Sequence, residues 1–152
     1  MKLSTKGRYA MVALADLALE EGDRFVTLTD ISARQNISLA YLEQLFVKLR
    51  RSGLVESVRG PGGGYRLARS SDSIRVSDVL EAVDEDIDAF SGGFTLSGGN
   101  SGTKAQSLTN RLWEGLSAQV YVFLHKVSLS DIVSNDLAPC PAVPNLLRVV
   151  DD

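Results

Sequence analysis

The sequence predicts a mainly α-helical fold with a small β-hairpin wing, arranged as a winged helix-turn-helix domain followed by a long dimerisation helix. Three observations predict it. A short helix, a tight turn and a strongly amphipathic helix follow one another over residues 27–53. A turn rich in glycine and proline joins two short β-type segments over residues 54–68. Residues 108–127 then carry apolar side chains at helical spacing.

Three helices are expected in the first third of the chain. Residues 5–20 repeat apolar side chains at helical intervals, and Gly22 lies where a helix end favours glycine. Thr27 or Thr29 would cap a second helix ending near residue 34, because a hydroxyl can accept a hydrogen bond from a free backbone N–H group. Ser38 would cap a third helix that ends near residue 52. Its apolar face consists of Leu42, Leu45, Phe46 and Leu49.

The hairpin that follows is interpreted as a wing. Strands are expected over 54–58 and 65–68, with Arg59 at the entry of the glycine-rich turn and Arg66 and Arg69 after it. Glycines let the backbone approach another molecule closely. A phosphate-cradling loop is the rival interpretation, but the turn lacks the Lys-Ser/Thr ending of such loops and precedes a strand.

The second half of the chain is expected to hold two shorter helices and a long one. Ser77 would cap a helix over 78–83, and Ser130 would cap another that ends near residue 135. The Gly/Ser/Thr-rich residues 91–107 are expected to form a flexible loop. The long helix over 108–127 is interpreted as a dimerisation element rather than one packed only on its own chain. Its seam would consist of Leu112, Leu116, Val120 and Phe123.

Three regions result from this pattern. They are a winged helix-turn-helix domain over 1–75, a linker helix, loop and dimerisation helix over 76–136, and a tail over 137–152. Trp113 is expected in the core and His125 at a surface or interface.

Charge is distributed unevenly between the two halves. The formal net charge is +4 over residues 1–75 and −7 over residues 76–152. A basic half suits a polyanion, and an acidic half suits a separate assembly function. Chance segregation of surface charge would give the same pattern.

Composition narrows the class of protein further. Cys140 and His125 are each the only residue of their type, so the chain cannot form an internal disulfide or a cysteine-based zinc site. No apolar run is long enough to cross a membrane. We therefore expect a cytoplasmic protein without membrane contact.

The exposed face of the third helix carries the residues expected to contact DNA. In helix-turn-helix proteins the N-terminal part of the second helix meets base edges, and cations further along meet phosphates. Gln44 could pair with adenine and Glu43 could accept from cytosine. The arginine at the wing entry suits a minor groove. The expected DNA-binding residues are Ser38, Ala40, Tyr41, Glu43, Gln44, Lys48, Arg51, Arg59 and Gly60.

Four segments of the chain resemble a known family. Residues 3–10, 37–46, 57–65 and 108–113 are similar to the dimeric winged-helix transcription regulators that include the iron–sulfur cluster regulators, and the similarity covers about residues 1–136. The resemblance implies a homodimer that binds double-stranded promoter DNA through two winged helices.

The sequence differs from the iron–sulfur regulators of this family in the loop before the long helix. There the family's iron–sulfur regulators hold a two-iron two-sulfur (2Fe-2S) cluster with three cysteines and a histidine. Two of those cysteines and the histidine correspond to Ser101, Ser107 and Asn110 here. The first cysteine has three candidate counterparts, which are Ser91, Thr95 and Ser97. Serine and asparagine are poor ligands because clusters need thiolates. We expect no cofactor and no metal in this chain.

Two other functions compete with DNA binding. The crowded carboxylates Asp84, Glu85, Asp86 and Asp88 could serve a metal enzyme, but no base, nucleophile or cofactor motif accompanies them. They are better explained as a solvated helix end. Alternatively, the winged helix could bind a protein partner. The basic first half and the position of Arg59 favour DNA, and no enzymatic activity is expected.

Overall fold

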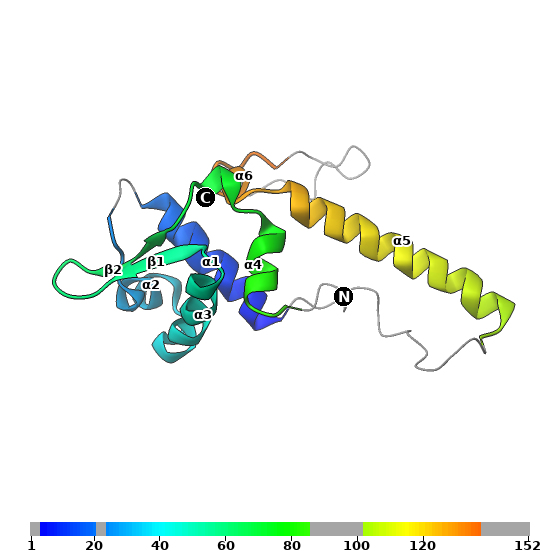
Figure 1. Cartoon of the computed structure of the whole chain (residues 1–152), viewed down its shortest axis with the longest axis horizontal. Coiled ribbons are helices and arrows are strands. Elements are labelled where there is room, and N and C mark those ends of the chain that lie inside the picture. The colour runs from blue at the N-terminus through cyan, green and yellow to red at the C-terminus, as the bar shows by residue number, and fades with distance from the viewer. Residues whose placement is uncertain (1–3, 21–23, 86–101, 138–152) are drawn as a thin grey trace.

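The structure is a computed structural model that describes residues 4–20, 24–85 and 102–137. It is mostly helical and contains one antiparallel hairpin, which confirms the expected fold class (Figure 1). The elements in chain order are α1 (Thr5–Leu19), α2 (Leu28–Gln35), α3 (Leu39–Arg51), β1 (Val55–Val58), β2 (Gly64–Leu67), the 3-10 helix η1 (Ser71–Ser73), α4 (Val76–Ala82), α5 (Lys104–Lys126) and α6 (Leu129–Val133).

The helix-turn-helix is bounded by the residues that the sequence indicates. The Thr27 hydroxyl accepts a hydrogen bond from the backbone N–H of Asp30 at 3.2 Å and starts α2. Asn36 ends α2 in the left-handed conformation, with φ of 53°, which an asparagine tolerates. The Ser38 hydroxyl then accepts from the backbone N–H of Tyr41 at 3.4 Å and starts α3.

One apolar core joins the three helices to the wing and to later elements. Phe46 of α3 is completely buried and its ring meets Tyr65 of β2 edge-on, with 4.8 Å between the ring centroids. Residue 75 ends the first predicted region, but the core continues across this boundary. Ile74 and Val79 are both buried in it, and so is Leu129 of α6. Burying each such side chain contributes about 1.5–3 kcal/mol, so α4 and α6 help to hold α1 and α3 in place.

The wing is anchored to the loop before α2. Strands β1 and β2 pair from Val55 with Leu67 to Val58 with Gly64. Val26 and Tyr65 exchange two backbone hydrogen bonds of 2.7 Å, an isolated β-bridge that ties β2 to this loop. A Cβ atom on Gly64, whose φ is 144°, would lie 2.5 Å from the Val26 carbonyl oxygen. Only glycine fits there.

Two predicted helix caps are wrong. Helix α4 begins at Val76, because Asp78 accepts a hydrogen bond from the backbone N–H of Arg75 at 2.9 Å. Ser77, the expected cap, lies inside α4, is 1% exposed, and its hydroxyl lies 3.2 Å from Nδ1 of His125. Its hydroxyl thus joins α4 to the end of α5.

The second wrong cap is Ser130, which lies within α6. The hydroxyl of Ser128 accepts from the backbone N–H of Asp131 at 3.1 Å, and the Asp131 carboxylate accepts from the N–H of Ser128 at 2.9 Å. This reciprocal pair needs a side chain with an acceptor oxygen three positions after the cap; Ser128 has Asp131 there, whereas Ser130 has Val133.

Helix α5 begins earlier than expected and extends away from the rest of the molecule (Figure 1). A reciprocal cap between Thr103 and Gln106 starts it at Lys104, so residues 104–107 are helical rather than part of a loop. Residues 102 and 103 precede the helix, and residues 91–101 of that predicted loop lie outside the described residues. No residue of α5 is buried, and Trp113, expected in the core, is only half-buried. Among the described residues, no helix is both long and apolar enough to span a membrane.

Candidate nucleic-acid interface

The exposed face of α3 presents polar side chains along its whole length. With about 3.6 residues per turn, Ala40, Gln44 and Arg51 form a strip opposite the buried Leu42 and Leu49. Ser38 and Glu43 are exposed beside this strip, and Tyr41 and Lys48 are half-buried at its edge. The structure thus brings together on α3 the predicted residues Ser38, Ala40, Tyr41, Glu43, Gln44, Lys48 and Arg51.

A shallow depression adjoins the N-terminal end of α3. The rings of Tyr9 and Tyr41 meet edge-on at 5.6 Å between centroids, so α1 supports the first turn of α3. The depression measures about 340 Å³ and its lining consists of Thr5, Tyr9, Asn36, Ile37, Ser38 and Tyr41. Thr5, Tyr9 and Asn36 were not expected at the interface, because helical periodicity assigns residues to faces of one helix and cannot place α1 beside α3.

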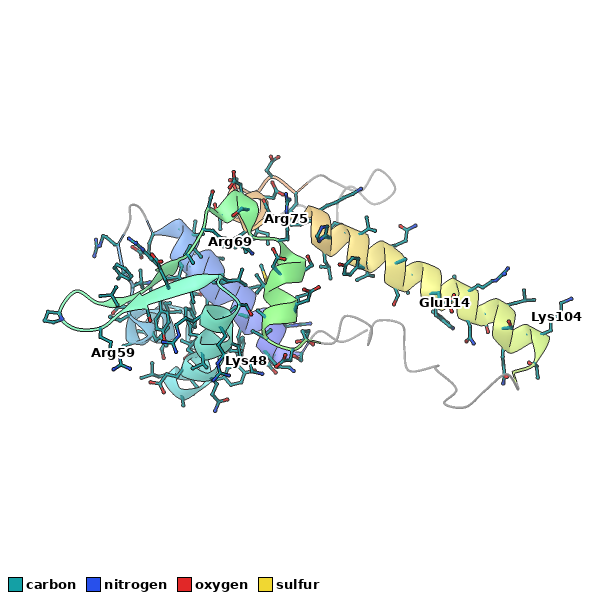
Figure 2. The ribbon with its side chains drawn as sticks, in the orientation of Figure 1. Lys48, Arg59, Arg69, Arg75, Lys104 and Glu114 are labelled. Carbon is teal, nitrogen blue, oxygen red and sulfur yellow. The ribbon has the colours of Figure 1, made fainter. Side chains whose placement is uncertain are left out.

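The tip of the wing carries an exposed arginine. Arg59 is exposed, and Gly60 after it has a φ of 100° with no atom within 4 Å of the position of a Cβ. Figure 2 shows Arg59 and Lys48 on the same side of the molecule, the lower side in that view. The wing and α3 therefore offer their polar groups to one side, as a groove-reading protein requires.

Two arginines near the wing have partners within the chain. Arg66 forms an ion pair with Glu56, and its guanidinium lies 4.5 Å from the centre of the Phe25 ring. Arg69 pairs with Asp78 of α4 at 3.3 Å and lies across the molecule from Lys48 (Figure 2). The arginine that the wing directs outward is thus Arg59.

Lys48 is also held by an internal partner. Its Nζ lies 2.8 Å from Oδ2 of Asp84, and this hydrogen bond lowers the pKa of Asp84 below its usual value. Arg50 and Arg51, next on α3, form no ion pair among the described residues and are exposed. Arg50 and Arg51 are thus better placed than Lys48 to meet phosphates.

The acidic run has structural roles where it is described. Asp84 holds Lys48, and Glu85 accepts hydrogen bonds from Ser4 and Gly7 of α1. Asp86 and Asp88 lie outside the described residues. Within residues 4–20, 24–85 and 102–137, no group of three or more His, Cys, Asp or Glu side chains could hold a metal ion.

Two of the positions expected from the resemblance to correspond to cluster ligands, Ser107 and Asn110, are described and lie on a helix. Ser107 is in the first turn of α5, where its N–H donates to the Thr103 carbonyl at 3.0 Å, and Asn110 follows one turn later. A hydroxyl and a carboxamide do not fit an iron–sulfur cluster, which needs thiolates. Ser91, Thr95, Ser97, Ser101 and Cys140 lie outside the described residues.

Helix α5 exposes a continuous apolar face. Leu112, Leu116 and Phe123 are 62%, 37% and 55% exposed, although each is a large apolar side chain. Val120 continues the same face and is half-buried. Ser107 and Glu114 lie on the opposite side of the helix by its period of about 3.6 residues per turn. An apolar stripe of this length on an isolated helix is typical of a contact between proteins.

The helix-turn-helix, the wing at its side and the exposed polar face of α3 together define a winged-helix DNA-binding regulator. A family model described as Rrf2, iron-dependent transcriptional regulator, matches residues 3–135. The chain belongs to the Rrf2 family. Proteins of this family are transcription regulators that bind DNA and are not enzymes.

Relatives with assigned roles support this membership. The chain is 68% identical to the HTH-type transcriptional regulator IscR of Cereibacter sphaeroides, over 100% of this chain and 99% of that protein. It is 49% identical to IscR of Yersinia pseudotuberculosis, over 89% and 80% of the two chains. This chain is an IscR-like regulator.

Solved structures agree with the fold. The structure of CymR, the global cysteine regulator of B. subtilis, has a TM-score of 0.74 and 32% identity, covering 88% of this chain and 97% of that one. T. potens IscR has a TM-score of 0.71 and 36% identity, covering 90% and 89%.

Proposed function

We propose that this protein acts as a homodimer that binds promoter DNA through two winged helices, in the cytoplasm. The main support is that α3 and the wing turn polar groups, with Lys48 and Arg59 among them, to one side of the molecule. In this division of labour, residues 1–75 bind DNA, residues 76–136 link and dimerise the chains, and residues 137–152 form a tail.

Each proposed DNA contact follows from its place on this side. Ala40, Glu43 and Gln44 lie near the start of α3 and reach base edges, where an amide can pair with adenine and a carboxylate can accept from cytosine. Ser38, Tyr41, Lys48 and Arg51 reach the phosphates or sugars, which fix register without reading sequence. Arg59 enters the minor groove, and Gly60 keeps the wing tip narrow.

Dimerisation is proposed through the apolar face of α5. A two-fold dimer brings the same face of each protomer together, so Leu112, Leu116, Val120 and Phe123 would be covered by their copies. The resulting pair of winged helices would meet two half-sites along the duplex.

We further propose that DNA binding needs no iron–sulfur cluster at the positions that the family's iron–sulfur regulators use. The side chains of Ser107 and Asn110 lack thiolate chemistry, and among the described residues α3 and the wing share one buried core with α1, α4 and α6. Anaerobic incubation with iron and sulfide, followed by visible absorption and a repeat of the DNA titration, tests this. Unchanged affinity is expected. The proposal would be contradicted by a stoichiometric absorption band that persists in a Cys140→Ser variant and is accompanied by a changed affinity for DNA.

The function itself is tested by selecting bound sequences from random duplex DNA. The protein should enrich a two-fold symmetric site, and Gln44→Ala should lose that enrichment while still binding DNA non-specifically. Glu114→Ala, on the exposed helix far from α3, is the matched control and should enrich the parent site. Failure of the parent protein to enrich any sequence would instead favour a winged helix that binds a protein partner.

A further inference from the structure

Helix α1 has no N-terminal cap of its own. Ser4 is in the capping position but its side chain accepts no hydrogen bond from the helix, and the first turn contains no acidic residue. The first N–H groups of a helix need acceptors, and a negative charge there is stabilising because of the helix dipole. An acceptor from elsewhere in the chain must therefore complete this helix.

The carboxylate of Glu85, 81 residues further along, supplies that acceptor. Its Oε1 accepts from the backbone N–H of Ser4 at 3.1 Å, and its Oε2 accepts from the N–H of Gly7 at 3.1 Å and from the Ser4 hydroxyl. Burial raises the pKa of Glu85, but these hydrogen bonds outweigh it and the net pKa lies below the usual value. The group is thus held in its charged form.

Glu85 is itself rigidly placed by the end of α4. Asp84 has a φ of 57°, and the N–H of Glu85 then returns to the Leu80 carbonyl at 2.9 Å. The same turn reaches both α1 and α3, because the Asp84 carboxylate holds Lys48 of α3 and the Asp84 carbonyl accepts from Lys6 of α1 at 3.0 Å. Figure 1 shows the start of α1 beside the end of α4.

Helix α1 in turn supports the recognition helix. Tyr9, about one turn after the capped end, meets the ring of Tyr41 edge-on, and Thr5 and Tyr9 line the depression at the start of α3. A shift of the first turn of α1 would move these groups relative to Ser38 and Tyr41.

We propose that Glu85 is a positioning residue for DNA recognition: by capping α1 from α4, its carboxylate fixes Tyr9 against Tyr41 and so sets the orientation of the recognition helix. The proposal rests on the DNA-binding function proposed above. It assigns to the acidic run after α4 a role in operator affinity that involves no metal and no contact with DNA.

The closeness of Gly7 makes the proposal testable through a second residue. A Cβ at Gly7 would lie 2.9 Å from Oε2 of Glu85 and 3.0 Å from Cδ2 of Leu80. Gly7→Ala should therefore displace the carboxylate, although alanine favours a helix more than glycine does. The contact with Leu80 is the same with or without Glu85, so the part of the effect that depends on Glu85 is isolated by making the substitution in both backgrounds.

The experiment measures the affinity of the full chain for operator DNA and for non-specific DNA. The variants are Glu85→Ala, Glu85→Gln, Gly7→Ala and the double variant that combines Gly7→Ala with Glu85→Ala. Glu85→Ala should weaken operator binding roughly three- to thirtyfold, the factor that corresponds to loss of an N-cap, and leave non-specific binding unchanged. Glu85→Gln should lose part of the affinity, because its single amide oxygen can accept from the N–H of Ser4 or of Gly7 but not from both. Glu81→Ala, exposed on the same helix, is the control.

The double variant gives the decisive comparison. Gly7→Ala should weaken operator binding in the parent and have a smaller effect once Glu85 is removed, because only the contact with Leu80 then remains. Parent-like operator affinity of Glu85→Ala, or additive losses in the double variant, would overturn the proposal. Should Glu85→Ala not fold, Glu85→Gln and Gly7→Ala carry the test, and equal parent-like affinity of both would overturn it. Failure of the parent to bind any operator refutes the proposed function instead.

Discussion

Truncating Leu112 to alanine should weaken the dimer in proportion to the area that this side chain exposes in the single chain. Leu112 is 62% exposed, and covering a whole leucine is worth about 1.5–3 kcal/mol, so its burial in a dimer contributes about 1–2 kcal/mol per protomer. A two-fold interface contains the residue twice. The free energy of dimer dissociation should therefore fall by about 2–4 kcal/mol, which raises the dissociation constant roughly 30- to 1000-fold.

Sedimentation equilibrium over a concentration series measures this change directly. Glu114→Ala lies on the opposite face of α5 and should leave the dissociation constant of the parent dimer unchanged. Phe123→Asp should give monomers, because a charge would be buried without a partner. An equally tight dimer in the Leu112→Ala and Phe123→Asp variants, or a monomeric parent, would refute dimerisation through this face.

Three further substitutions probe the DNA-binding half. Arg59→Ala should weaken operator binding by about 1–3 kcal/mol, the scale of one good base contact, and equal affinity in a titration would count against the wing. Glu43→Ala should broaden the set of selected operators without changing the melting temperature, since a carboxylate at the bases rejects sites that offer it no donor. Asp16→Asn should lower the free energy of unfolding by about 1–3 kcal/mol at pH 7, because it loses charge-assisted hydrogen bonds. The hydrogen bond from Arg34 lowers the pKa of Asp16, so the parent should lose this stability as the pH falls below about 4, and urea titrations of the variant should show a smaller decline over that range.

Local patterns predicted most of the DNA-binding half. Thr27 and Ser38 combine a hydroxyl with a following apolar repeat, and both cap the expected helices. The glycine-rich turn between two short strands forms the wing. These features depend on neighbours within a few residues, which a single sequence displays.

Long-range partners could not be predicted in this way. Lys48 and Arg69 belong to a basic half, but each pairs with a carboxylate contributed by the acidic half. Glu85 caps a helix that begins 81 residues earlier. Ser77 has the chemistry of a cap, yet Asp78 accepts from Arg75 and leaves Ser77 to meet His125. Only the packing of α4 against α1, α3 and α5 decides these pairings.

The salt dependence of operator affinity tests DNA binding by this face most directly. Arg50, Arg51 and Arg59 are exposed without an ion-pair partner among the described residues, and a dimer presents each of them twice. Each phosphate contact releases about 0.9 counterion. These arginines should therefore give a slope near −5 when the logarithm of the association constant is plotted against the logarithm of the salt concentration. Fluorescence anisotropy with a selected operator should show this slope, and Arg59→Ala should flatten it. A parent protein whose affinity is independent of salt would contradict the proposed interface.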